Sequence, residues 1–145
     1  TTLLRDLVRC LSTGGAGRPG LRVSLIDERG EVAVMVRGVP QMDVGPRTDV
    51  LDACPKALGI PMALRAMNPQ VIAVDEITAE ADLRAAVQAA GCGAGLLATI
   101  HAADVSELGQ RPLYRQLLSE GVFRLAVCIR RSETGRTYQV EALPC

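Results

Sequence analysis

The chain has 145 residues, enough for one domain with a sizeable core. Sixteen basic residues balance sixteen acidic ones, so the net charge gives no general attraction to nucleic acid or to anionic lipid. Aromatic residues are only 2% of the sequence, which argues against a stacking platform for single-stranded nucleic acid. No apolar run approaches the ~20 residues of a membrane span. Five cysteines without CxxC spacing predict neither a zinc site nor disulfides, and a reducing cytoplasm fits them best.

The first third of the chain predicts one helix, short strands and a long loop. Leucine and valine residues at helical spacing predict a helix over residues 2–11, and four glycines and a proline predict a loop over 12–20. Aliphatic residues predict a strand over 21–26, and a polar turn at 27–30 leads to a further short strand at 31–36. Residues 37–54, with two glycines and two prolines, predict a long ordered loop.

The rest of the chain alternates helices with continuous apolar strands. The predicted helices cover residues 56–67, 79–90 and, split near Pro112, 105–121. The predicted strands cover residues 71–74, 96–100, 123–130 and 137–143, and a turn at 132–136 joins the last two. This alternation indicates an α/β fold with a mostly parallel sheet covered by helices, followed by an antiparallel C-terminal hairpin. We expect one domain over residues 1–145.

Two carboxylates close the clearest strand. Val71–Val74 is an apolar run, and Asp75 and Glu76 follow it at the end of the strand where open α/β sheets bind ligands. Asp75 could hold a hydrated magnesium ion, and Glu76 could polarise a water for attack on a terminal phosphate. The alternative is a strand that ends in solvated charges or in a helix cap.

The start of the chain carries a second, weaker signal. Thr1 and Thr2 run directly into an amphipathic helix, as do the residues after the lysine of a phosphate-binding GxxxxGK[ST] loop. We therefore expect that this loop and the strand before it are cut off just before residue 1. Thr1 would then supply a magnesium-binding hydroxyl and Thr2 would lie beside the nucleotide. The alternative is that Thr1 is only a helix cap.

Five segments in order carry a resemblance to a known family. They are TTLLRDL (1–7), RVSLIDERGEVA (22–33), GVPQMDVGPRTDVLDACPKALG (38–59), LRAMNPQVIAVDEI (64–77) and RPLYRQLLSEGVF (111–123). The chain resembles the stage III sporulation protein AA family, relatives of the hexameric secretion ATPases. The resemblance implies a RecA-like P-loop fold that binds ATP and magnesium. It also implies a self-assembled ring, a hexamer, in the mother-cell cytoplasm of endospore formers, with membrane partners at the channel facing the forespore.

The resemblance also implies roles for individual residues. Thr1 and Asp75 belong to the magnesium site, and Glu76 is the favoured water-activating base. Glu28, in the acidic box after the second strand of the fold, is its rival for that task. His101, the only histidine, would sense the terminal phosphate, although a histidine that merely caps a strand end is the alternative.

Three arginines are candidates for a finger that crosses a subunit interface. They are Arg47, Arg65 and Arg111, and Arg65 is preferred because it precedes the strand that carries Asp75. A solvated surface role is the alternative for each of them.

Two further expectations concern the chain as a whole. Without the phosphate loop it should bind ATP weakly and hydrolyse it negligibly, and without the preceding strand the sheet should show a gap between 96–100 and 123–130. Two other functions stay open beside the motor subunit: a nucleotide-dependent assembly or scaffold protein without turnover, and a RecA-like nucleic-acid translocase. The neutral charge and few aromatics argue against direct contact with nucleic acid.

Overall fold

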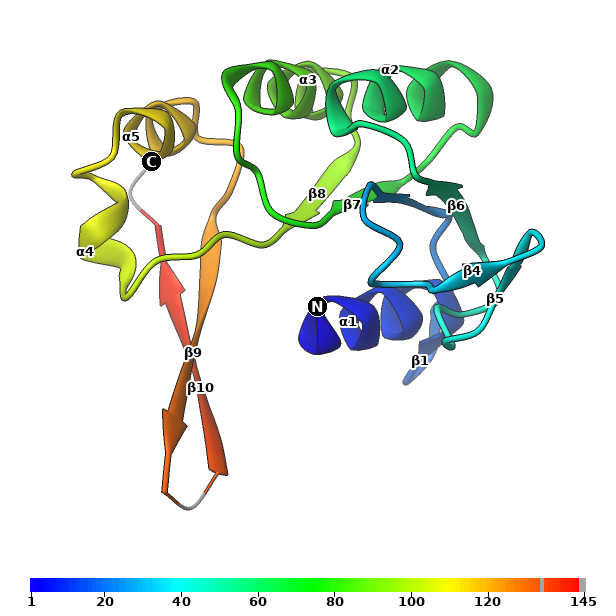
Figure 1. Ribbon diagram of the computed structural model, residues 1–145, viewed down its shortest axis with the longest axis horizontal. Coiled ribbons are helices and arrows are strands. Elements are labelled where there is room, and N and C mark those ends of the chain that lie inside the picture. The colour runs from blue at the N-terminus through cyan, green and yellow to red at the C-terminus, as the bar shows by residue number, and fades with distance from the viewer. Residues whose placement is uncertain (134, 144–145) are drawn as a thin grey trace. The chain divides into compact units, whose positions relative to one another are not determined.

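The computed structural model describes residues 1–133 and 135–143 and separates into two compact units (Figure 1). The first unit is Thr1–Ile100 and the second begins at His101. The expectation of a single domain stays a prediction. Among the described residues no helix is both long and apolar enough to cross a bilayer.

A parallel four-stranded sheet forms the centre of the first unit. Its strands lie in the order β6 (Thr48–Asp52), β3 (Val23–Asp27), β7 (Val71–Val74) and β8 (Gly95–Ala98). All five residues of β3 are buried, as are the last three of β7, because both strands are interior and covered on both faces. The parallel sheet predicted from continuous apolar runs is confirmed.

Strand β6 corrects one prediction, because it lies within the segment expected to be a loop. Of its five residues only Leu51 is buried. It is an edge strand, so it shows no continuous apolar run, and its position is fixed by pairing along the whole of β3, from Val23 opposite Thr48 to Asp27 opposite Asp52. The remainder of the expected loop holds β5 (Val39–Pro40).

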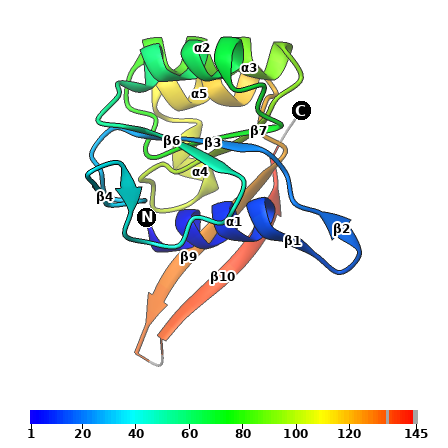
Figure 2. The same ribbon diagram turned by 90° about the vertical axis from the view of Figure 1, so that its right-hand side faces the viewer.

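Helices cover both faces of this sheet (Figure 2). Helix α1 (Thr2–Thr13) lies on one face, and α2 (Lys56–Ala66) and α3 (Glu80–Gly91) lie on the other. Helix α1 ends where Gly14 takes a positive φ of 76°. At the start of α3 the carboxylate of Asp82 accepts hydrogen bonds from the backbone N–H groups of Thr78 and Ala79.

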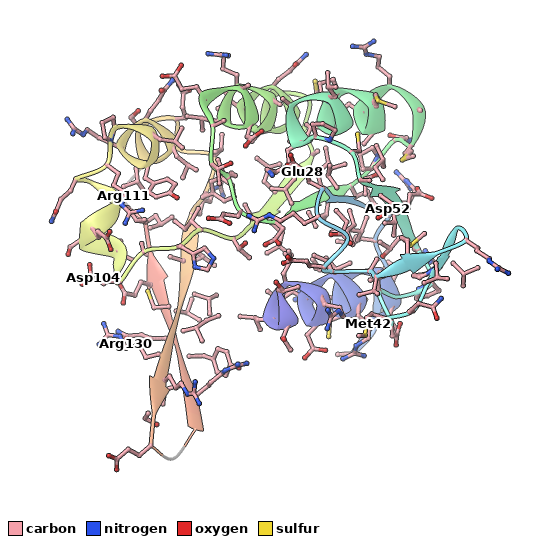
Figure 3. All side chains as sticks on the ribbon, viewed as in Figure 1. Glu28, Met42, Asp52, Asp104, Arg111 and Arg130 are labelled. Atoms are coloured by element: carbon pink, nitrogen blue, oxygen red, sulfur yellow. The ribbon has the colours of Figure 1, made fainter. Side chains whose placement is uncertain are left out.

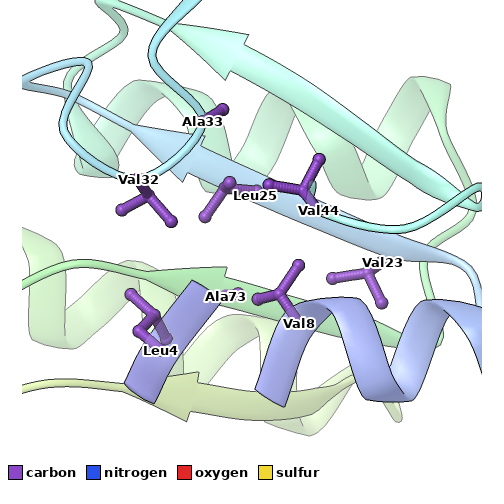
Figure 4. Close-up of a cluster of buried hydrophobic side chains, with 8 residues drawn as sticks. All are labelled: Leu4, Val8, Val23, Leu25, Val32, Ala33, Val44 and Ala73. Atoms are coloured by element: carbon purple, nitrogen blue, oxygen red, sulfur yellow. The ribbon is translucent and has the colours of Figure 1, made fainter. Parts of the chain in front are cut away.

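The core of the first unit lies between α1 and the sheet (Figure 4). The side chains of Leu4 and Val8, four residues apart on α1, pack against aliphatic residues of β3 and β7 and of the segment between β3 and β6. The buried cluster consists of Leu4, Val8, Val23, Leu25, Val32, Ala33, Val44 and Ala73. It fixes the direction of α1 relative to the strands, which decides where Thr1 and Thr2 lie.

Two short hairpins complete the first unit. One joins β1 (Gly14–Gly15) to β2 (Arg18–Pro19) inside the predicted glycine-rich loop. The other joins β4 (Met35–Val36) to β5, so the short strand expected over 31–36 is reduced to its last two residues. The polar turn predicted at 27–30 begins at Asp27, the last residue of β3. The Asp27 carboxylate holds this turn by accepting hydrogen bonds from the backbone that follows it.

The second unit contains two short helices and an antiparallel hairpin. The helices are α4 (Val105–Leu108) and α5 (Pro112–Ser119), split at Pro112 as predicted. Strand β9 (Leu125–Ser132) pairs with β10 (Gly135–Ala142), which confirms the predicted hairpin. Its expected turn includes residue 134, which lies outside the described residues. Within the described part of the chain, β9 pairs only with β10 and β8 only with β7, so the strands do not form one continuous sheet.

Candidate functional site

Acidic residues follow two neighbouring strands of the parallel sheet. Strand β3 continues from Asp27 into Glu28, and β7 continues directly into Asp75 and Glu76. Because β3 and β7 are adjacent, parallel and paired in register, both strands end at the same edge of the sheet. We call this the carboxyl edge. It is the edge where open α/β sheets bind ligands.

The first turn of α1 reaches the same carboxyl edge. Arg5 donates hydrogen bonds from Nε to the carbonyl of Val32, at 2.6 Å, and from Nη2 to the carbonyl of Glu31, at 3.0 Å. Both carbonyls lie just beyond the end of β3. At the far end of α1, the Ser12 hydroxyl accepts a 2.6 Å hydrogen bond from the backbone N–H of Arg47, which precedes β6. Helix α1 therefore runs against the strand direction, with its N-terminus at the carboxyl edge.

Thr1 and Thr2 are thereby placed on the same side of the first unit as the twin acids. Thr1 is the N-cap residue of α1, but its hydroxyl makes no capping hydrogen bond, and both threonines are exposed. The interpretation of Thr1 as a mere side-chain cap is therefore not supported. Its hydroxyl remains available for another ligand.

Asp75 and Glu76 are held by a threonine from the next strand. The Thr99 hydroxyl, just past β8, donates a 2.7 Å hydrogen bond to Asp75 Oδ1 and accepts a 2.9 Å hydrogen bond from the backbone N–H of Glu76. The same N–H also donates to Asp75 Oδ1 at 3.1 Å. Glu76 adopts a positive φ of 25°, which is uncommon for a residue other than glycine. A fixed carboxylate beside a strained backbone is typical of a functional site.

Each candidate base is paired with a cation. One of the two bases, Glu28, is labelled in Figure 3. Glu76 Oε2 lies 2.5 Å from Nη2 of Arg29, which raises the pKa of Arg29 above its ordinary value, chiefly through that hydrogen bond. Glu28 forms an ion pair with Nζ of Lys56, the first residue of α2. The Lys56 side chain is 6% exposed, whereas that of Arg29 is 52% exposed. The two pairs therefore differ in their access to solvent.

Asp27 organises the turn that follows β3 at this edge. It is fully buried, and its carboxylate accepts hydrogen bonds from the backbone N–H groups of Glu31, Val32 and Ala33. These bonds satisfy buried donors and shape the turn that carries Glu28. The turn thus holds Glu28 and Arg29 where they meet their partners.

The structure does not bring Arg65 to the carboxyl edge. Helix α2 starts there, at Lys56, and ends near Asn68, whose carbonyl accepts a 2.9 Å hydrogen bond from Arg22 Nε just before β3 begins. Arg65 is exposed in the last turn of α2, at the opposite edge of the sheet from Glu76. A role within its own chain is not supported, and a role across a subunit interface stays a prediction.

His101 and the other two arginines make contacts within their own units. His101 is exposed and opens the second unit, where its carbonyl accepts a 3.3 Å hydrogen bond from Nη1 of Arg111. Arg111 also pairs with Glu107. In the first unit Arg47 Nη1 donates a 3.0 Å hydrogen bond to the carbonyl of Gly20. Sensing by His101 stays a prediction.

Three residues of the site were missed by sequence reasoning: Arg29, Lys56 and Thr99. Arg29 and Lys56 lie inside two of the five segments that carry the family resemblance, Arg22–Ala33 and Gly38–Gly59, which is a signal that could have found them. Thr99 sits at the end of an apolar strand next to the one that carries Asp75, and hydroxyl residues at such ends often bind ligands or their ligating groups.

Asp75 and Thr1 are donors that fit a hydrated magnesium ion. Among the described residues there is no cluster of three histidine, cysteine or carboxylate side chains that could hold a metal. Magnesium keeps several waters and needs only one or two protein ligands. Asp75 offers an oriented carboxylate and Thr1 an uncapped hydroxyl at the same edge.

The sequence comparisons identify the family. Residues 1–141 match the profile of the family described as "Sporulation stage III, protein AA". The chain belongs to this family. It is 43% identical over 123 residues to stage III sporulation protein AA of Bacillus subtilis strain 168, an alignment that covers 85% of the chain and 40% of that protein. The chain therefore spans about two fifths of the length of the curated relative that it matches.

Two solved structures with a similar fold are ATPases, and a third is a pilus retraction motor. VirB11 from the Brucella suis type IV secretion system superposes on 97% of this chain, with 19% identity and a TM-score of 0.64. The match covers 44% of the VirB11 chain. DotB from Legionella pneumophila matches 97% of this chain and 39% of its own, with 18% identity and a TM-score of 0.59. PilT, a pilus retraction motor, matches 85% of this chain and 38% of the PilT chain, with 16% identity and a TM-score of 0.52. These likenesses confirm the predicted RecA-like P-loop ATPase fold.

Proposed function

We propose that this chain is the ATP- and magnesium-handling core of a motor subunit that hydrolyses ATP in a secretion-type apparatus of spore formation. One observation carries the proposal: the N-terminus of α1 and the acids after β3 and β7 share one edge of the sheet. Helix N-termini favour phosphate, and carboxylates at strand ends favour its metal ion. The family and the ATPase fold support the same function.

Anions and nucleotide occur in two of the solved relatives. VirB11 was solved in complex with sulphate and PilT with bound ADP. For this chain, Thr1 and Asp75 would hold the magnesium ion, which when bound neutralises charge on the phosphate oxygens. Thr2 would lie beside the nucleotide. The hydrogen bond from Thr99 to Asp75 would keep that carboxylate turned toward the ion.

Glu76 is the preferred base, for two reasons. It directly follows Asp75, so a water beside the magnesium ion would lie near its carboxylate. Its partner Arg29 is half-exposed, whereas Glu28 is paired with the buried Lys56. Glu28 would then hold the start of α2 at the carboxyl edge through its ion pair with Lys56.

The subunit would form a ring, a hexamer, in the mother-cell cytoplasm and dock on membrane components of the sporulation channel. Arg65, exposed at the end of α2, would reach a neighbouring subunit, and His101 would sense the terminal phosphate. The 145-residue chain contains no GxxxxGK[ST] motif, so by itself it should bind ATP weakly and turn it over negligibly.

The test is Glu76→Gln in the full-length gene product. A positioned general base contributes about 10²- to 10⁴-fold, so ATP turnover should fall at least about a hundredfold while binding of ATP persists. Glu80→Gln is the matched control, because Glu80 is an exposed acid on α3. Wild-type protein that binds ATP without turnover would support the scaffold alternative. A fall in turnover with Glu28→Gln but not with Glu76→Gln would move the base to Glu28.

A further inference from the structure

We propose that Arg29 is the residue that recognises the terminal phosphate of ATP, and that it exchanges Glu76 for that phosphate when ATP binds. The inference rests on the proposed ATPase function and adds a residue and a coupling to it. It begins from the ion pair between Arg29 Nη2 and Glu76 Oε2, at 2.5 Å. Arg29 lies in an exposed turn just after β3.

The chemistry of the guanidinium makes the exchange feasible. Its planar fork of N–H donors fits a carboxylate and a phosphate equally well, in both cases with charge-assisted hydrogen bonds. Glu76 directly follows Asp75, the proposed magnesium ligand. A phosphate bound to that ion would therefore lie close to Glu76, the residue that Arg29 contacts. The phosphate and the Glu76 carboxylate would therefore compete for the same donors.

The other two cations described at this edge, Lys56 and Arg5, already bond to other groups. The Lys56 side chain is 6% exposed and is paired with Glu28. Arg5 donates from two of its nitrogens to backbone carbonyls. Arg29 is 52% exposed, and among the described residues its side chain bonds to Glu76 alone. Of these three side chains, only that of Arg29 belongs to an exposed residue, so Arg29 can change partner at the lowest desolvation cost.

The exchange would couple binding to chemistry. While Arg29 holds Glu76, the carboxylate is engaged and turned toward the guanidinium. When a terminal phosphate takes Arg29, Glu76 is released to orient the attacking water. ADP lacks the third, γ-phosphate of ATP, so it would leave the ion pair in place. A ligand can shift such an equilibrium only through its different affinity for the two states, which makes the coupling measurable.

The experiment is a double-mutant cycle on nucleotide binding by the full-length gene product. Wild type, Arg29→Ala, Glu76→Gln and the double variant are titrated with ADP and with a non-hydrolysable ATP analogue, each with magnesium. Arg29→Ala should weaken the analogue about tenfold and change ADP by less than about twofold. Glu76→Gln should tighten the analogue several-fold in the wild-type background, because it frees Arg29, and should have no effect when Arg29 is absent.

The controls separate the possible failures. Arg84→Ala removes an exposed arginine of α3 that pairs with Glu80 and should change neither affinity. Arg29→Lys keeps the charge and should retain part of the preference for the analogue, and it replaces Arg29→Ala if the latter does not fold. Equal losses for ADP and analogue, or the same effect of Glu76→Gln in both backgrounds, overturn the role of Arg29 alone. A wild-type protein that binds neither nucleotide overturns the proposed function as well.

Discussion

The hydroxyl of Thr99 donates a 2.7 Å hydrogen bond to Oδ1 of Asp75, and it links the end of β8 to the end of β7. The backbone reinforces the link, because the N–H of Ile77 donates to the carbonyl of Thr99 at 3.2 Å. The carboxylate of Asp75 is therefore fixed by the neighbouring strand. In the proposed site, such a partner determines which way a metal ligand faces.

Thr99→Val should damage both stability and activity. Valine has nearly the same shape, but it leaves Asp75 Oδ1 without its hydroxyl donor and Glu76 N–H without one of its two acceptors. We expect a loss of about 1–3 kcal/mol in the free energy of unfolding, measured by urea denaturation. In the full-length protein, the magnesium concentration needed for half-maximal ATP turnover should rise about 10- to 100-fold. Thr99→Ser keeps the hydroxyl and should stay close to wild type; if it behaves like valine, the hydrogen bond is not the cause.

The ion pair between Glu28 and Lys56 should matter more for stability than the one between Arg84 and Glu80. Glu28→Gln leaves the charge of Lys56, 6% exposed, without its carboxylate. A fully buried pair broken in this way costs about 3–5 kcal/mol, and because Glu28 is itself 39% exposed we expect about 1–3 kcal/mol. Glu80→Gln breaks an exposed pair and should change the free energy of unfolding by less than about 0.5 kcal/mol.

A double variant tests the cause of that effect. Adding Lys56→Met to Glu28→Gln removes the uncompensated charge and should restore most of the lost stability, measured in the same urea titration. Additive losses in the double variant would show that the two residues act independently and would contradict the interpretation.

The carboxyl edge was predictable because strand direction follows from continuous apolar runs. The runs over 21–26 and 71–74 predict buried parallel strands, and the acids that follow them must then meet at one edge. The cation and hydroxyl partners were not predictable in the same way. Arg29 meets Glu76 across 47 residues, Lys56 meets Glu28 across 28, and Thr99 meets Asp75 across 24. Such pairs depend on the register of the sheet and the placement of α2, which local sequence does not contain.

Strand β6 was missed for a related reason. Thr48–Asp52 carries three polar residues among five, and only Leu51 is buried. An edge strand pairs through its backbone and can expose most of its side chains, so no periodic apolar signal marks it. The pairing with β3 supplies the missing information, and it also determines where α2 begins and hence where Lys56 lies.

The cap of α4 gives a pH prediction for the second unit. Asp104 Oδ1 accepts hydrogen bonds from the Ser106 hydroxyl at 2.6 Å and from the backbone N–H of Glu107 at 3.0 Å. The first of these is the main reason that the pKa of Asp104 is lowered. A lowered pKa in the folded state contributes stability above the unfolded pKa and loses it as the pH falls through the folded pKa. The cap should therefore weaken on the acid side of the ordinary aspartate range.

Ser106→Ala should raise the pKa of Asp104 toward its ordinary value. The midpoint of the carboxyl carbon chemical shift, followed by NMR from neutral pH to acid, reports this directly. Ser119→Ala is the matched control, because the Ser119 hydroxyl bonds to the Gln116 carbonyl and not to a carboxylate. An unchanged midpoint in Ser106→Ala would show that the serine hydroxyl does not stabilise the ionised cap.

Two helical glycines should respond differently to substitution by alanine. A Cβ on Gly59 of α2 would lie 2.7 Å from Cγ2 of Ile26 and 3.1 Å from Sγ of Cys54. Ile26 is fully buried in β3, so it cannot move away freely. Gly59→Ala should therefore separate α2 from the sheet and cost about 1–3 kcal/mol in the free energy of unfolding, despite the better helix propensity of alanine. Lys56, three residues earlier, would shift with the helix, so ATP turnover of the full-length protein should fall as well.

Gly91, the last residue of α3, is the matched control for Gly59. A Cβ there would meet no other atom within 4 Å, so Gly91→Ala should leave stability unchanged or raise it by up to about 1 kcal/mol. Urea denaturation of the two variants side by side measures the difference in packing, because the gain in helix propensity is similar for both. Equal stability of the two variants would contradict the close contact between α2 and β3, and with it the placement of Lys56 beside Glu28.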